Sequence, residues 1–226
     1  MNRNCLSPPP RPRPRSLARA LGLAAGFAAV ALIPSVPAAS TPMHDPHAHH
    51  AMAKPSGNQD YQRAEVRYAV PDASLRDQQG RSVTMAEVLA DRRPVMLNFI
   101  FTSCTAVCPV MTATFAQVQT QMGTERKDLR MVSISIDPEH DTPKRLAAYA
   151  ARFKAEDNWT FLTGKLADIV ALQRAFGVYR GDKMNHSPTA FIRTAPTAPW
   201  VRIDGFTRAK VLIEEYHRQR ARLSAQ

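Results

Sequence analysis

A buried strand that runs into a helix through two cysteines constrains the fold of this chain more than any other feature. The segment Val95–Phe101 is apolar at nearly every position, which is typical of a strand covered on both faces. Apolar side chains then recur at helical spacing, at Met111, Phe115, Val118 and Met122. Cys104 and Cys108 fall at the junction, where the unpaired N–H groups and the dipole of a helix start favour the thiolate. Two such sulfurs suit redox chemistry or soft-metal binding.

The rest of the chain alternates strand-like and helical patterns, which predicts one three-layer α/β domain over residues 61–226. A β-hairpin of Arg67–Leu75 and Arg81–Thr84 is expected to lead into a central mixed sheet with a parallel core and an antiparallel edge. Further strands are expected at Leu129–Ile136, Trp159–Leu162, Thr189–Arg193 and Trp200–Asp204. Helices are expected at about 108–122, 142–153, 165–176 and 207–223, the second with Thr142 as N-cap and Pro143 in its first turn.

The first forty residues have the order of a secretory signal. Five arginines and no acidic residue precede the apolar stretch Leu21–Ile33, and small residues follow it. This stretch is short for a membrane span, although a start at Leu17 would allow an uncleaved anchor. Residues 1–40 are therefore predicted to be a signal peptide or a membrane anchor, with the rest exported to the periplasm or anchored facing it. No role is predicted for Cys5, which precedes the apolar stretch.

The charge of the exported part does not indicate a nucleic-acid partner. The chain has a formal net charge of +11, but five of its 30 basic residues are leader arginines, which leaves 25 basic against 19 acidic residues, or +6. The remaining lysines and arginines are scattered, with no basic run interleaved with aromatic residues. We therefore expect an ordinary solvated basic surface.

Export would leave only two cysteines in an oxidising compartment, where a Cys104–Cys108 disulfide can form. A purely structural bridge is the less favoured interpretation of the pair. So small a loop removes little entropy from the unfolded chain, and about 185 residues can bury a full core without a bridge.

Residues 41–60 are predicted to form a disordered tether, because they are rich in proline, alanine and histidine and lack apolar periodicity. Imidazole and thioether groups, which can bind copper, gather there at His44, His47, His49, His50, Met43 and Met52. The segment is either a metal-binding strand or a polar linker with incidental histidines.

Three segments resemble one known family. A cysteine pair between a central strand and the next helix resembles the thioredoxin fold. The runs NFIFTSCTAVCP, SISIDPEHDTPKRLAAYA and GDKMNHSPTAFI, in that order, look like the Sco/SenC family of copper chaperones, which help assemble cytochrome c oxidase. The resemblance covers the chain from about Tyr68 to the C-terminus and implies a thioredoxin-like fold.

The resemblance implies copper as cargo and Cys104, Cys108 and His186 as its ligands, since the two motif cysteines and the later histidine bind copper in that family. The chemistry agrees, because two thiolates suit Cu(I) and an added imidazole also permits Cu(II). The implied function is a copper-binding chaperone rather than an enzyme. It would deliver copper to, or mature the copper site of, the copper subunit of a membrane-bound respiratory oxidase, with a thiol reductant as a second partner.

The chain departs from the family pattern next to the histidine. Family members commonly have an acid before it, whereas this chain has Asn185, so the carboxylate contact that would orient the imidazole is either weakened or supplied from elsewhere. Pro188 resembles the cis-proline that faces the cysteines of thioredoxins, and a cis bond there would favour dithiol exchange.

Other polar residues near the motifs are interpreted as structural. Asp137 and Asp141 open a loop at a strand end close to the active face of such sheets, but capping and turn formation explain them better than chemistry does. His140 is interpreted as a solvated loop residue and His217 as a surface residue of the last helix.

Two alternative functions use the same sulfurs. An exported thiol-disulfide oxidoreductase would reduce the cysteines of a copper-site protein, with Cys104 as the attacking thiol. A peroxiredoxin has some support because Thr105 precedes Cys108 by three residues, but Phe101 stands where that family has proline.

Overall fold

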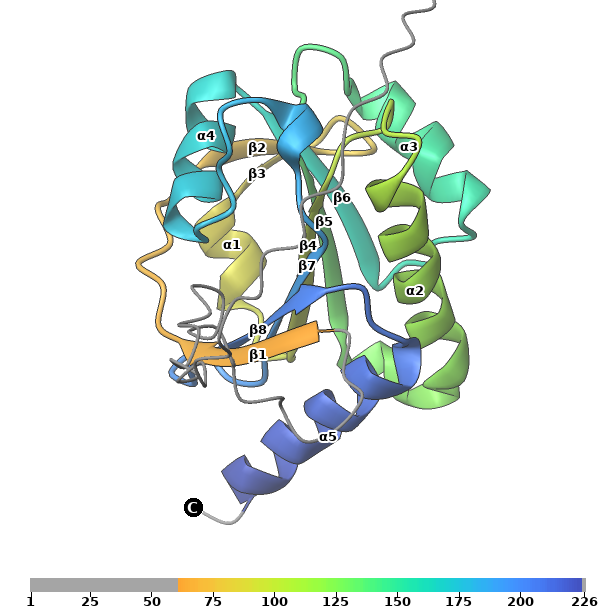
Figure 1. The fold of residues 1–226 in the computed structure, drawn as a ribbon, viewed down its shortest axis with the longest axis vertical. Helices are drawn as coiled ribbons and strands as arrows, with labels where there is room; N and C mark the ends of the chain where they lie inside the picture. The colour runs from red at the N-terminus through yellow and green to blue at the C-terminus, as the bar shows by residue number, and fades with distance from the viewer. Residues whose placement is uncertain (1–60, 225–226) are drawn as a thin grey trace, which may run out of the picture. The chain divides into compact units, whose positions relative to one another are not determined.

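The computed structural model describes residues 61–224, which form an α/β domain around one mixed sheet (Figure 1). The predicted signal or anchor and the histidine-rich segment lie outside the described residues. No helix within residues 61–224 has the length and apolar character needed to cross a membrane.

Eight strands pair in the order β1-β8-β7-β4-β5-β6-β2-β3. They are β1 (Tyr61–Val66), β2 (Ser74–Asp77), β3 (Ser82–Thr84), β4 (Val95–Ile100), β5 (Arg130–Ser135), β6 (Trp159–Gly164), β7 (Thr189–Arg193) and β8 (Trp200–Gly205). The strands β4, β5 and β6 are parallel to one another, whereas β7, β8 and β1 add antiparallel neighbours on one side and β2 and β3 on the other. The parallel core and antiparallel edge are therefore confirmed.

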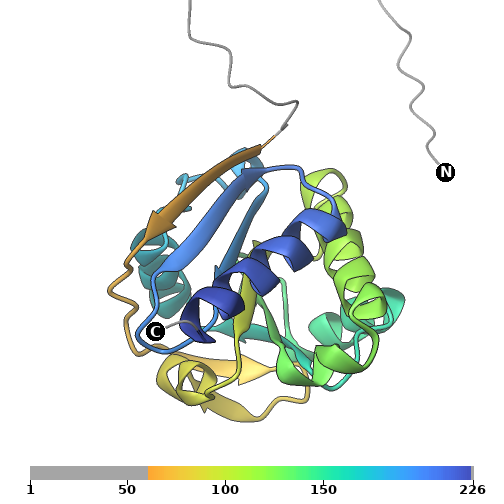
Figure 2. The same ribbon diagram turned by 90° about the horizontal axis from the view of Figure 1, so that it is seen from below.

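Helices cover both faces of the sheet. They are α1 (Met85–Ala90), α2 (Val107–Gln121), α3 (Pro143–Arg152), α4 (Leu166–Ala175) and α5 (Ala209–Ser224), with short 3₁₀ turns η1 (Gly123–Asp128) and η2 (Lys183–Asn185). Figure 1 shows α2 and α3 on one side of the sheet and α1 and α4 on the other. The helix α5 contacts α2, as Figure 2 also shows from below. This is the predicted three-layer arrangement.

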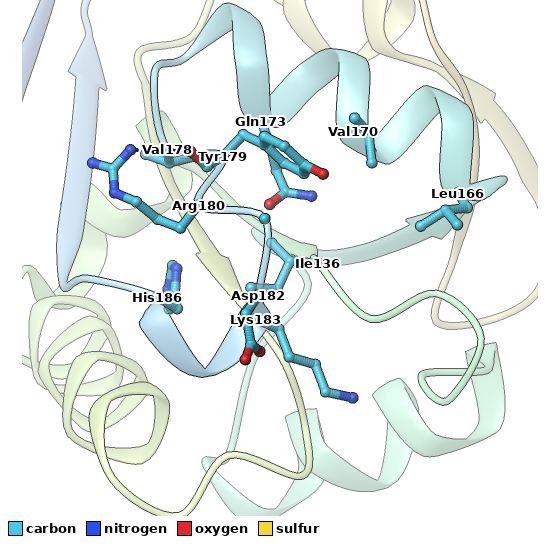
Figure 3. Close-up of a pocket in the computed structure, with 11 residues that line it drawn as sticks. Ile136, Leu166, Val170, Gln173, Val178, Tyr179, Arg180, Asp182, Lys183 and His186 are labelled. Carbon is cyan, nitrogen blue, oxygen red and sulfur yellow. Dashed lines mark hydrogen bonds between the residues drawn. The ribbon is translucent and has the colours of Figure 1, made fainter.

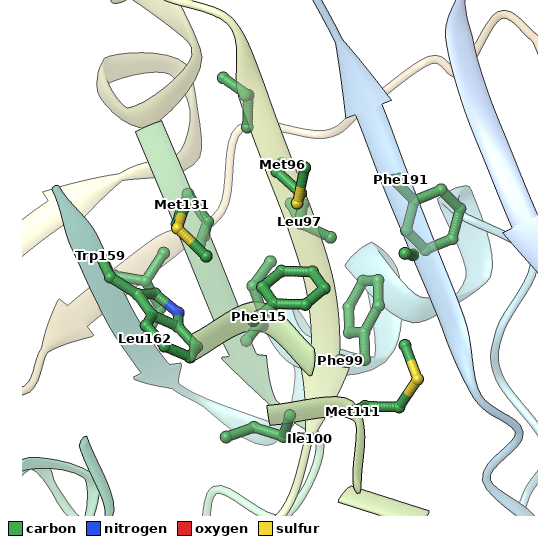
Figure 4. Packing of buried hydrophobic residues seen from close by; sticks show 14 of the residues in the cluster. Met96, Leu97, Phe99, Ile100, Met111, Phe115, Met131, Trp159, Leu162 and Phe191 are labelled. Carbon is green, nitrogen blue, oxygen red and sulfur yellow. The ribbon is translucent and has the colours of Figure 1, made fainter. Parts of the chain in front are cut away.

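The central strand β4 is buried at all six positions, as its apolar run predicts (Figure 4). On the α4 face, the ring of Phe99 lies 5.6 Å from that of Phe176 and 6.1 Å from that of Phe191. On the α2 face, the ring centroid of Phe115 lies 5.9 Å from that of Trp159. Because aromatic rings pack on both faces, the end of β4, where the cysteine loop begins, is fixed in the core.

The prediction of a strand over Arg67–Leu75 as the first arm of the hairpin is wrong for most of that range. Residues 67–73 have no regular secondary structure, and the hairpin consists of β2 and β3. Pro71 lies in the middle of the predicted strand and has no N–H to donate to a sheet. The strand β1 and the helix α1 were not predicted. β1 is mostly exposed, so it lacks an apolar pattern and forms because it pairs with β8.

Candidate metal centre

The two cysteines lie where the central strand leads into α2, as predicted. Residues 101–106 form the cysteine loop between β4 and α2. The N–H of Cys108 donates to Cys104 Sγ (3.4 Å), and the N–H of Phe101 donates to Cys108 Sγ (3.4 Å). Both thiols are free. A backbone N–H thus donates to each sulfur and stabilises negative charge on it.

The two thiols differ in burial and in acidity. Partial burial is the largest influence on Cys104 and raises its pKa, but the N–H groups of Cys108, Ala106 and Val107 and the Cys108 thiol together lower that pKa below its usual value. Cys108 is only 1% exposed. Burial raises its pKa strongly, with additions from Cys104 and Asp141 and a partial offset by the Phe101 N–H. Its lower pKa and greater exposure make Cys104 the sulfur better suited to nucleophilic attack.

Asp141 fastens the cysteine loop to the end of β5. Its carboxylate is fully buried and accepts from the N–H of Thr102 (3.0 Å), from the Thr102 hydroxyl and from the Ser135 hydroxyl (2.6 Å). A buried carboxylate is tolerated when several donors satisfy it. Asp141 thereby fixes the loop that carries Cys104. Asp141 does not cap α3. The N-cap is Thr142, as predicted, and its hydroxyl accepts a hydrogen bond from the N–H of Arg145.

His186 lies beside the cysteine loop, directly before β7. The ladder between β4 and β7 ends at Asn98 and Ala190, so it provides no strand partner for the carbonyl of Phe99. The imidazole Nε2 of His186 lies 2.9 Å from that carbonyl oxygen. Its ring also meets the ring of Phe101, with the centroids 6.5 Å apart. The side chain thus closes the gap where the ladder stops.

The contact with Phe99 determines which nitrogen of His186 is available. A carbonyl oxygen can only accept, so Nε2 carries the proton and Nδ1 keeps its lone pair. Burial lowers the pKa of His186, although the Phe99 carbonyl opposes this and Arg180 adds to it. The ring is therefore neutral at pH 7, which is the form that binds metals. The Phe99 carbonyl, rather than a carboxylate, therefore orients the imidazole.

Phe101 links the histidine to the cysteines. Its N–H binds Cys108 Sγ and its ring contacts His186. Even so, no three His, Cys, Asp or Glu side chains in the described part of the chain are grouped closely enough to hold a metal ion as they stand. The structure brings His186 to the cysteine loop, and its role as third ligand stays a prediction.

The other polar residues considered from the sequence have structural contacts. The carboxylate of Asp137 pairs with Lys183 (2.6 Å), His140 binds Arg145, and exposed His217 lies 3.6 Å from Glu125. Residues 61–224 contain no cis peptide bond, so Pro188 is trans and the condition for a thioredoxin-like cis-proline is not met.

A cavity of about 210 Å³ lies beneath the loop that joins α4 to β7. Apolar side chains of Ile136, Val170 and Val178 line it, and Arg180, Lys183 and His186 of the loop border it (Figure 3). The loop between α4 and β7, which carries His186, therefore faces a cavity rather than a densely packed core. We refer to this segment as the histidine loop. Sequence reasoning missed Lys183, because its partner lies 46 residues away.

Comparison with known proteins supports one family. The SCO1/SenC family model matches residues 63–218. The SCO1 protein homolog of Bacillus subtilis is 37% identical over 100 residues, which cover 44% of this chain and 51% of that protein. The chain spans about half the length, or less, of the curated relatives it matches: 51%, 52% and 28%.

Two solved structures resemble the domain. BsSco, a member of the Sco family of cytochrome c oxidase assembly proteins with a disulfide switch, is 27% identical with a TM-score of 0.58, over 68% of this chain and 94% of that chain. Copper-bound ScoI of Bradyrhizobium japonicum is 25% identical with a TM-score of 0.50, over 57% and 85%. The predicted thioredoxin-like fold is thereby confirmed.

The asymmetry of the thiols predicts selective alkylation. In reduced protein with Cys5→Ser, iodoacetamide should modify Cys104 first, with a rate that levels off at a pH below the ordinary thiol value of 9.0, because the thiolate forms earlier. Cys108 should react only after unfolding, since its pKa is raised and its sulfur is buried. Mass spectrometry of peptides across a pH series measures both rates. Equal rates for the two sulfurs would contradict the assignment.

Replacing Asp141 should loosen the cysteine loop. Asp141→Ala leaves the donors of Thr102 and Ser135 unsatisfied, so the free energy of unfolding should fall by about 3 kcal/mol. Urea denaturation of the reduced protein measures the loss. Asp157→Ala, which removes an exposed carboxylate, is the control and should change stability little. A loss no larger than that of the control would show that the buried network is unimportant.

Proposed function

Since the chain belongs to the SCO1/SenC family, as the sequence motifs predicted, we propose that it is a copper chaperone that uses Cys104, Cys108 and His186 as ligands. The observation that carries the proposal is the cysteine loop. It presents two sulfurs with backbone donors at the start of α2, and a neutral histidine packs against Phe101 of the same loop. Copper is the cargo of this site.

The donor set fits copper in either oxidation state. Two thiolates favour Cu(I), and the imidazole adds the nitrogen that Cu(II) accepts. Because Nε2 of His186 donates to the Phe99 carbonyl, Nδ1 is the atom left to bind metal. Loading requires the dithiol, so a thiol reductant of the same compartment is an implied partner.

The recipient and the location follow from the same proposal. We infer that the protein matures the copper site of a membrane-bound respiratory oxidase, such as cytochrome c oxidase, in the periplasm. The family membership and the leader of residues 1–40 support this assignment. Cys104 is the more exposed sulfur of the pair, so a recipient's ligands would reach copper from its side.

The ligand set is tested by copper titration of the reduced full chain with Cys5→Ser. We expect one copper held by the two sulfurs, with thiolate-to-copper absorption and nitrogen coupling in the Cu(II) spin resonance spectrum. Cys104→Ser or Cys108→Ser should abolish the absorption, and His186→Ala should remove the nitrogen coupling at this site.

The control for the histidine is His217→Ala, because His217 is an exposed imidazole on α5 away from the cysteine loop. That variant should leave both signals unchanged. Unchanged spectra in His186→Ala would exclude the three-ligand site, even if the two sulfurs still bind copper.

A second function is favoured by the difference between the two thiols. Cys104 can attack a disulfide of a copper-site protein, forming a mixed disulfide and releasing one partner thiolate. Cys108 then attacks Cys104 Sγ, which closes the Cys104–Cys108 disulfide and releases the second partner sulfur. Two electrons pass to the partner, and the thiol reductant restores the dithiol. This exchange is compatible with copper delivery.

Oxidised glutathione tests the exchange, since it is a simple disulfide. All variants carry Cys5→Ser, so that no leader thiol reacts. With Cys108→Ala, a glutathione adduct on Cys104 should accumulate, because the resolving sulfur is gone. The unchanged cysteine pair should form only a transient adduct and end as the internal disulfide. Mass spectrometry distinguishes the species, and Cys104→Ala is the control that should form no adduct. A stable adduct on the unchanged pair would argue against the oxidoreductase.

A further inference from the structure

Lys183 joins the turn that carries His186 to the part of the fold that holds the cysteines. Its ammonium lies 2.6 Å from the Asp137 carboxylate, at the end of β5. The same ammonium lies 5.8 Å from the centre of the Phe101 ring, within the range of a cation–π interaction. Phe101 in turn contacts His186 and binds Cys108 Sγ. The Lys183 side chain therefore contacts both Asp137 and Phe101, the residues that lie against the turn before His186.

Backbone hydrogen bonds join Lys183 to His186. The carbonyl of Lys183 accepts from the N–H of His186 (3.1 Å). Asp182 closes the turn with two hydrogen bonds. Its side chain accepts one from the N–H of Met184 (2.9 Å), and its carbonyl accepts one from the N–H of Asn185 (3.1 Å). Lys183 and His186 thus belong to one closed hydrogen-bonded unit.

The turn has no apolar anchor of its own. None of the residues of η2 is buried, and Met184 is 70% exposed. On the inner side the loop borders the cavity rather than a packed core. Its position therefore depends on polar contacts, chiefly the Lys183 ammonium and the His186 imidazole.

Asp137 is a fixed anchor for that ammonium. Its side chain is 10% exposed, against 43% for Lys183. The Asp137 N–H donates to Ser135 Oγ (3.0 Å), and its carbonyl accepts from the N–H of Asp141 (2.8 Å). Ser135 and Asp141 also hold the cysteine loop through Thr102. The anchors of the histidine turn and of the cysteine loop are the same short segment.

We propose that Lys183 is a positioning residue for the third copper ligand, which holds the His186 turn against Asp137 and Phe101. This inference rests on the proposed copper site. A ligand held near its working position loses less freedom when metal arrives, so Lys183 strengthens the contribution of His186 to binding. The sulfurs themselves do not contact Lys183, and their redox properties should not depend on it.

The test variant is Lys183→Met in the full chain with Cys5→Ser, because methionine keeps an unbranched side chain but removes the charge. Copper affinity, followed by thiolate-to-copper absorption in a chelator competition, should fall about two- to tenfold. In the metal-free protein, the His186 amide should exchange with solvent faster by a similar factor. Asp137→Asn should reproduce both changes.

Rescue and control variants separate positioning from general damage. Lys183→Arg keeps the charge and should restore most of the affinity. Lys127→Met removes an exposed lysine from η1, at the opposite end of the parallel strands, and should alter neither measurement. The reduction potential of the Cys104–Cys108 pair should stay unchanged in all four variants.

A double-mutant comparison decides the route of the effect. With His186→Ala already present, Lys183→Met should weaken copper binding no further, because the ligand it positions is gone. An equal loss with and without His186, or an unchanged amide exchange rate, would overturn the proposal. Failure of the copper site itself would show separately, as a lack of any effect of His186→Ala alone.

Discussion

The buried carboxylate of Asp141 is the contact on which the candidate site depends. It accepts three hydrogen bonds, and the donors come from two separate segments, Thr102 of the cysteine loop and Ser135 of β5. A carboxylate out of water is costly unless its donors are all in place. The fold therefore completes the network only when the cysteine loop and the end of β5 are both in their final positions, and the sulfurs are placed as a consequence.

From that fixed loop, the two sulfurs acquire different properties. Cys108, in the first turn of α2, is buried in the core, so burial opposes its ionisation. Cys104 is only partly buried and accepts hydrogen bonds from several backbone N–H groups. In the proposed site, a soft cation such as copper would replace the protons on both sulfurs, and its charge would compensate for the burial of Cys108. The same asymmetry suits a dithiol that attacks with one sulfur and resolves with the other. The two proposed functions, metal binding and thiol-disulfide exchange, would thus use the same geometry.

The sequence predicts the centre of the fold better than its edges. The apolar run of β4 and the Thr142–Pro143 start of α3 carry strong local signals, and both are confirmed. The edge strand β1 has polar, exposed residues, so only its pairing with β8 identifies it. The cysteine pair was visible from spacing. The partners of Thr102 and Lys183 are 39 and 46 residues away, and no local pattern reports contacts of that separation.

The histidine turn is attached mainly by polar contacts, which would suit the release of the proposed copper cargo. A resident metal would favour a ligand locked in the core, but copper that must leave needs at least one ligand that can withdraw. The imidazole of His186 makes one hydrogen bond, to the Phe99 carbonyl, and the adjacent turn η2 buries none of its residues. Cys104, in contrast, lies in the loop that Asp141 fastens, and Cys108 lies in the first turn of α2. In the proposed copper site, two ligands would be fixed and one movable, so copper could leave without disturbing the fold that positions the sulfurs.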